Sequence, residues 1–92
     1  MEWRETSNRM CNQGEGPMIP RPRPGFLDTC ISLGYIYGEK RWRSRCGAYL
    51  YTWDSFHGEV EVYTKIGDHF GVADGITGVI FKKAVRGRTI DV

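Results

Sequence analysis

The chain has 92 residues, of which 40% are hydrophobic and 26% are charged. This length suits one small domain and is too short for two, and the composition excludes wholesale disorder. No run approaches 18 apolar residues, so we expect no transmembrane helix, and residues 1–12 lack the features of a signal peptide. The net charge of +2 arises in residues 33–58, which carry four cations and two anions.

Residues 1–24 read as a leader or linker to a domain over residues 25–92. Prolines alternate with arginines at positions 20–24, which excludes a helix or a central strand there. Residues 26–33 predict a short helix, because their apolar positions fall mostly at helical spacing and Gly34 is suited to end it. A strand over residues 31–37 is the alternative.

A basic run follows at residues 40–45, with an aromatic residue inside it. Lys40, Arg41 and Trp42 begin this run, and two further arginines complete it. Cations beside an aromatic ring suit phosphate contact combined with base stacking. The alternative is a solvated edge strand, since lysine and arginine on sheet edges discourage aggregation.

From residue 46 the hydrophobic pattern has a period of two. It predicts strands over residues 48–53, 59–64, 69–73 and 79–82, separated by turns rich in glycine, and a last strand near residues 89–91. In the second of these strands, Glu59, Glu61 and Tyr63 share one face and Val60 and Val62 share the other. The pattern therefore indicates an antiparallel meander, all-β in class, or α+β if residues 26–33 are helical.

Three cysteines, at positions 11, 30 and 46, have no spacing that supplies four zinc ligands. We expect no metal site and free thiols, although one disulfide bridge is compatible with the count.

Residues 54–61 concentrate proton-transfer groups. Asp54 and His57 flank a predicted loop, and Glu59 and Glu61 project from the polar face of the next strand. Histidine titrates near neutrality and a carboxylate can serve as a base or an orienting group, so this set suits general acid–base chemistry. The alternative is that the glutamates occupy the wet face of an amphipathic strand. His69 is interpreted as structural or incidental.

The segment over residues 51–63, YTWDSFHGEVEVY, resembles the signature of the cytotoxic ribonuclease domain of ribosome-targeting E-group colicins. That signature is an aromatic residue, one residue, Trp-Asp-Ser, one residue, His-Gly-Glu, one residue, Glu, one residue and Tyr. The likeness covers residues 38–90 and includes Asp68-His69-Phe70-Gly71, Asp74, Thr77-Gly78, Lys82, Arg88-Thr89-Ile90 and, upstream, Lys40-Arg41-Trp42.

The resemblance implies an α+β, mainly β fold, with a strongly twisted antiparallel sheet preceded by a short helix. It also implies an endoribonuclease that needs no metal or cofactor and cuts small-subunit ribosomal RNA at the decoding centre. Carried onto this sequence, the catalytic set is Asp54, His57, Glu61 and Arg88, and the substrate-binding set is Lys40, Arg41, Trp42, Glu59 and Lys82. The family's N-terminal tyrosines have only Tyr35 and Tyr37 as candidates here.

Those residue types fit the chemistry of RNA cleavage. The substrate supplies its own nucleophile, the 2′-hydroxyl, so Glu61 can accept the proton from that hydroxyl while His57 protonates the leaving 5′-oxygen. Asp54 would orient the imidazole, and Arg88 would hold the charged phosphorane. Of the aromatic residues, Trp42, Tyr49 and Tyr51 are candidates to stack on bases, or they form the core of the sheet.

The resemblance further implies an acidic immunity protein as partner and a larger polypeptide for delivery. Such a toxin is secreted or carried on a cell surface, as a colicin or a contact-dependent inhibition effector, and acts in the cytoplasm of the target bacterium. The alternative function is a non-catalytic RNA-binding module. The carboxylates favour the ribonuclease, because acidic groups beside a phosphate repel it unless they transfer protons.

Overall fold

The computed structural model describes residues 18–92 and consists of six strands and one short 3-10 turn. The turn, η1, spans Phe26–Thr29. The strands are β1 (Ile31–Ile36), β2 (Glu39–Arg43), β3 (Tyr49–Asp54), β4 (Glu59–Thr64), β5 (His69–Ala73) and β6 (Ile80–Lys83). Within residues 18–92, no helix is long and apolar enough to cross a membrane.

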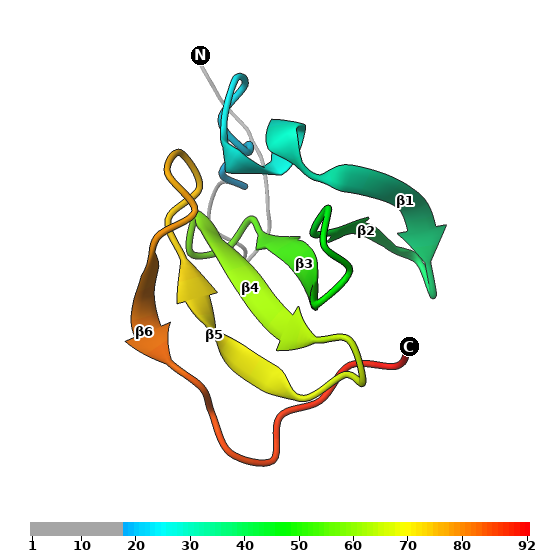
Figure 1. Ribbon diagram of the computed structural model, residues 1–92. Helices are drawn as coiled ribbons and strands as arrows, with labels where there is room; N and C mark the ends of the chain where they lie inside the picture. The colour runs from blue at the N-terminus through cyan, green and yellow to red at the C-terminus, as the bar shows by residue number, and fades with distance from the viewer. Residues whose placement is uncertain (1–17) are drawn as a thin grey trace, which may run out of the picture.

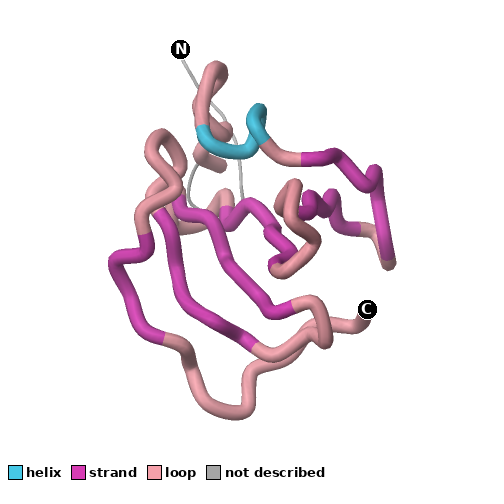
Figure 2. Tube along the Cα trace, in the orientation of Figure 1, coloured by secondary structure: helices cyan, strands magenta, loops and turns pink. Residues whose placement is uncertain are grey.

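All six strands form one sheet in sequence order, and each neighbouring pair is antiparallel. The predicted antiparallel meander is confirmed. The sheet twists strongly, so that β1 and β2 are turned well away from the direction of β4 and β5 (Figure 1). Most of the remaining chain is loop, including the long C-terminal segment that returns beside β5 (Figure 2).

The prediction of a helix over residues 26–33 is wrong. Only η1 is helical, no α-helix occurs among residues 18–92, and Ile31–Ile36 form strand β1, as the alternative proposed. Pairing with β2 outweighs the local helical spacing, and Gly34 lies inside the strand at a register shift, with a φ of +75°, instead of ending a helix. The predicted last strand shrinks to a single bridge between Asp68 and Thr89.

The core lies on one face of the sheet, where η1 covers it. Val60 and Val62 have almost no exposed surface, as the alternation in residues 59–64 predicted. The remaining buried members of the cluster are Leu27, Trp42, Tyr51 and Ala73. Phe26 packs edge-on against Tyr51, with ring centroids 5.1 Å apart. Fully burying each valine contributes about 1.5–3 kcal/mol, so this face anchors β4, whose other face carries Glu59 and Glu61.

Cys30 and Cys46 are free thiols, and Cys11 lies outside the described residues.

Candidate active site

Asp54 organises the loop between β3 and β4. Its Oδ1 accepts hydrogen bonds from the backbone N–H groups of Phe56 (3.0 Å) and His57 (3.1 Å), and Gly58 completes the turn with a φ of +69°. This turn carries His57 back over the carboxylate, whose Oδ2 lies 2.8 Å from the imidazole Nδ1. The prediction that His57 lies in a loop before the strand is confirmed.

The Asp54–His57 contact fixes how the imidazole is presented. Burial alone would raise the pKa of Asp54, but the hydrogen bonds from the His57 ring and from the two backbone N–H groups outweigh burial and lower that pKa. Because the carboxylate is ionised it can only accept, so Nδ1 carries a proton and donates it. Among residues 18–92, the opposite ring nitrogen, Nε2, has no hydrogen-bond partner and is left for a substrate, and the His57 side chain is 65% exposed.

Glu61 lies in the middle of β4, between Thr52 on β3 and Val72 on β5. Its Oε1 accepts two hydrogen bonds, from His69 Nε2 at 2.7 Å and from Arg88 Nη1 at 3.2 Å. Only 13% of the Glu61 side chain is exposed, so the carboxylate is held in one orientation by partners on two other segments.

His69 is the site residue that sequence reasoning missed. Its side chain is fully buried, and its Nδ1 accepts the Val85 N–H at 2.8 Å, so the ring proton must sit on Nε2, where it is donated to Glu61. A register shift between β4 and β5 lets Tyr63 pair with His69 and brings the ring to the face that carries Glu61. Val72 pairs with Glu61 and so marks the face that carries the site. Strict alternation would put His69 on the face opposite to Val72, so the period of two did not predict that His69 belongs to the site.

The C-terminal segment positions Arg88. The His69 N–H donates to the Arg88 carbonyl at 3.0 Å, the Arg88 N–H donates to the Val85 carbonyl at 3.1 Å, and Thr89 bridges to Asp68. These bonds fasten the segment alongside the start of β5, where it passes below the sheet in Figure 1. The Arg88 side chain is 45% exposed, so its remaining donors can reach a ligand.

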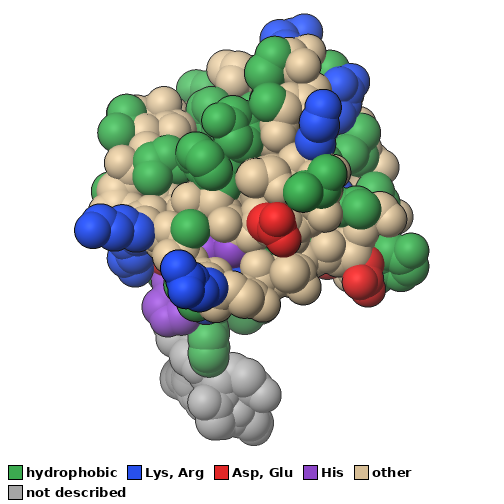
Figure 3. Space-filling view, turned by 60° about the horizontal axis from the view of Figure 1, so that its bottom comes forward, with side chains coloured by type: hydrophobic (Ala, Val, Ile, Leu, Met, Phe, Trp, Pro, Cys, Tyr) green, Lys and Arg blue, Asp and Glu red, His purple; other side chains and the backbone are tan. Residues whose placement is uncertain are grey.

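Six of the sequence-predicted residues meet in one cleft of about 230 Å³. They are Asp54, His57, Glu59, Glu61, Lys82 and Arg88, and they are joined there by Val72, Lys83 and Val85. Lys82 donates to Glu59 at 2.7 Å, which offsets one of the three carboxylates. Figure 3 shows Lys and Arg side chains gathered beside the histidines on one face of the molecule.

The basic run divides between surface and interior. Arg41 is 3% exposed and Trp42 is 4% exposed, which leaves both with little surface for direct contact with a substrate. Trp42 belongs to the core, whereas Arg41 Nε has no hydrogen-bond partner among the described residues. Lys40 is half-buried, with its ammonium 5.4 Å from the centre of the Trp42 ring. Of these three residues, Lys40 is the one with an accessible charge.

The structure brings together three groups with potential metal-ligand atoms. One ligand atom each from Asp54, His57 and Glu59 lies within 4.8 Å of the other two. Spacing along the chain did not predict this grouping. Asp54 is already hydrogen-bonded to His57, and Glu59 is paired with Lys82, so a cation would have to compete with both contacts.

A family model described as Cytotoxic matches residues 33–91. The chain belongs to this family. Membership implies a toxin ribonuclease of the colicin type, and the match contains every residue of the cleft described above. A search of the curated proteins found no match to the chain. Residues 18–32, which the structure also describes, lie outside the region that the Cytotoxic family model covers.

Proposed function

We propose that this Cytotoxic-family domain is a metal-independent endoribonuclease that cuts small-subunit ribosomal RNA at the decoding centre and so blocks translation. The observation that carries the proposal is the shared cleft in which an oriented imidazole, a fixed carboxylate and an arginine meet: His57, Glu61 and Arg88. RNA needs no enzyme nucleophile, so a base, an acid and a phosphate-binding group are sufficient.

In the proposed reaction, Glu61 accepts the proton of the 2′-hydroxyl, and the freed oxygen attacks the adjacent phosphorus. Within residues 18–92, both hydrogen bonds to this carboxylate reach Oε1, which leaves Oε2 to take that proton. The bond from phosphorus to the 5′-oxygen then breaks, and Nε2 of protonated His57 gives its proton to that oxygen. The products are a 2′,3′-cyclic phosphate and a 5′-hydroxyl.

Asp54 and Arg88 support the charges that develop during this reaction. Asp54 accepts from Nδ1 of His57 and so directs Nε2 toward the leaving oxygen. Arg88 offers N–H donors beyond the one on Glu61, and a planar guanidinium suits the phosphorane, on which negative charge accumulates. Each proton transfer is worth about 10²–10⁴ in rate.

The proposal also includes two partners. A toxin domain requires an immunity protein in the producing cell, and Lys40, Lys82 and Arg88 near the clefts favour an acidic one. Delivery into the target cytoplasm requires a larger polypeptide or a carrier.

The test is to incubate the purified chain with intact ribosomes and map any break in the small-subunit RNA by primer extension. We expect one cut in the decoding centre with the wild-type chain and none with His57→Ala, whose exposed position leaves the fold intact. Tight ribosome binding by both proteins without a cut would instead support the non-catalytic RNA-binding module. Cuts scattered over both subunits would contradict the proposed substrate.

A further inference from the structure

We infer that residues 20–24, which lie outside the family match, form with β2 a second binding site for the RNA strand, in which Arg23 and Lys40 contact its phosphates. This inference rests on the proposed function, since it extends the same cleft to more of the substrate. From its proline content alone, this segment is predicted to be a linker; the inference gives it a role in RNA binding.

The segment that leads into η1 is fastened to the sheet. The Ile19 N–H donates to the Ser55 carbonyl at 2.8 Å, and the Trp53 indole N–H donates to the Ile19 carbonyl at 2.7 Å. Arg21 is held twice, by an ion pair with Asp28 at 2.9 Å and by stacking 5.2 Å from the centre of the Trp42 ring. Arg21 is therefore placed against Trp42 of β2, and the start of the segment is fastened to Trp53 of β3.

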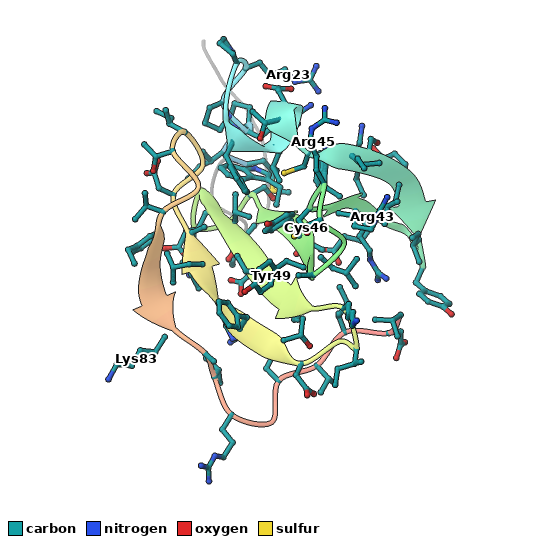
Figure 4. All side chains as sticks on the ribbon, viewed as in Figure 1. Arg23, Arg43, Arg45, Cys46, Tyr49 and Lys83 are labelled. Atoms are coloured by element: carbon teal, nitrogen blue, oxygen red, sulfur yellow. The ribbon has the colours of Figure 1, made fainter. Side chains whose placement is uncertain are left out.

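These contacts enclose a cleft of about 880 Å³ between the segment and β2. Among residues 18–92, its charged lining consists of Arg21, Arg23 and Lys40 with the carboxylate of Glu39. Asp28 offsets Arg21, so Arg23 and Lys40 supply the excess of cations. An excess of cations in a groove attracts a polyanion and raises its local concentration. Figure 4 shows Arg23 beside η1, at the end of the molecule away from Lys83 on β6.

This cationic cleft is continuous with the active site. It shares Met18, Glu39, Trp53 and Ser55 with an intermediate cleft of about 510 Å³. The intermediate cleft in turn shares Asp54, Glu61 and Arg88 with the proposed catalytic cleft. An RNA strand whose cleaved bond lies at Glu61 can therefore run through the intermediate cleft, past the C-terminal end of β3, to Arg23.

The lining favours single-stranded RNA. Tyr35 reaches the same cleft with 75% of its surface exposed, so its ring can stack on a base that is not paired. A cationic groove that tracks the backbone, combined with an exposed aromatic platform, is the arrangement by which proteins bind single strands. Arg21 is committed to Asp28 and Trp42, which leaves Arg23 and Lys40 as the more adaptable phosphate contacts.

The experiment measures binding of a single-stranded RNA oligonucleotide to the full 92-residue chain carrying His57→Ala, which prevents cleavage, over a series of salt concentrations. Adding Arg23→Ala and Lys40→Ala together should reduce the slope of log affinity against log salt by about 1.4, at about 0.7 for each phosphate contact on a single strand. Adding Tyr35→Ala should weaken binding about tenfold with an unchanged slope. The matched control is Lys65→Ala, which removes an exposed cation in the turn between β4 and β5, outside the three clefts.

The inference is overturned if Arg23→Ala with Lys40→Ala changes the slope no more than Lys65→Ala does. The same substitutions in the chain with His57 intact provide a second readout: the KM for RNA should rise by more than it does in Lys65→Ala. If the wild-type chain cuts no RNA but the slopes differ as expected, the proposed function fails and the binding site stands. If the wild-type chain cuts RNA and the slopes do not differ, the binding site alone is refuted.

Discussion

Substitution of His69 provides the sharpest test of how the sheet positions Glu61, the proposed general base. The ring makes two hydrogen bonds from one buried position, with Nε2 donating to Glu61 and Nδ1 accepting from Val85. The amide of glutamine reaches about as far as Nε2, and the amide of asparagine about as far as Nδ1. His69→Gln can therefore keep the donor to Glu61, whereas His69→Asn can keep only the acceptor for Val85.

The expected loss of cleavage rate follows from the hydrogen bond that each variant loses. A hydrogen bond to a charged group contributes about 1.5–3 kcal/mol, whereas a neutral bond contributes about 1 kcal/mol. With 1.36 kcal/mol for each tenfold change in rate, His69→Asn should slow cleavage about 10- to 150-fold if the full contribution orients Glu61. His69→Gln should stay within about tenfold of wild type. Either variant replaces a fully buried side chain, so thermal unfolding should show a similar loss of stability in both.

The assay is single-turnover cleavage at saturating ribosome, below the unfolding temperature of both variants. If the two variants slow cleavage equally, and in proportion to their loss of stability, then His69 serves the fold alone. If both cleave at the wild-type rate, the bond to Glu61 contributes nothing to positioning the base.

Three further predictions concern the metal, the arginine and the core. Cleavage of a decoding-centre RNA fragment should persist in EDTA, a fragment being used because ribosomes themselves require Mg²⁺; loss of activity restored by added metal would assign Asp54, His57 and Glu59 to a cation instead. Arg88→Ala should lower the single-turnover rate at saturating ribosome with little change in binding, and Arg88→Lys should recover only part of it, because an ammonium lacks the planar fork; an unchanged rate would remove Arg88 from the mechanism. Burial raises the pKa of Tyr51 to about 12, above its unfolded value of about 10, so its contribution to stability is complete below pH 10 and is lost as pH rises toward 12. Urea unfolding of Tyr51→Phe should therefore show a shallower alkaline loss than wild type, by about 2 kcal/mol, and identical curves would contradict this.

Regular alternation and turn residues were enough to predict the centre of the sheet. The predicted ranges 59–64 and 69–73 coincide with β4 and β5, because valines alternate with polar residues in the first range and glycine-containing turns bound both strands. The same alternation placed Glu59 and Glu61 away from the core, and the loop residues between two strands placed Asp54 beside His57. This part of the site follows from local sequence alone.

The remaining features depend on pairing between strands, which local patterns do not report. The register shift at Tyr63 turns His69 toward Glu61, and no period of two anticipates it. Residues 31–36 have mostly helical spacing yet form β1, because β2 lies beside them to pair with. Trp42 sits within a basic run that looks solvent-exposed, but its place opposite Tyr51 buries it in the core.

The end groups of the cut RNA test the central claim most directly. If Glu61 activates the 2′-hydroxyl and His57 protonates the 5′-oxygen, the break must leave a 2′,3′-cyclic phosphate on one fragment and a 5′-hydroxyl on the other. Mass spectrometry of both fragments from wild-type-treated ribosomes distinguishes these ends. We expect the cyclic phosphate, and a 3′-hydroxyl facing a 5′-phosphate would show that water is the nucleophile and contradict the mechanism.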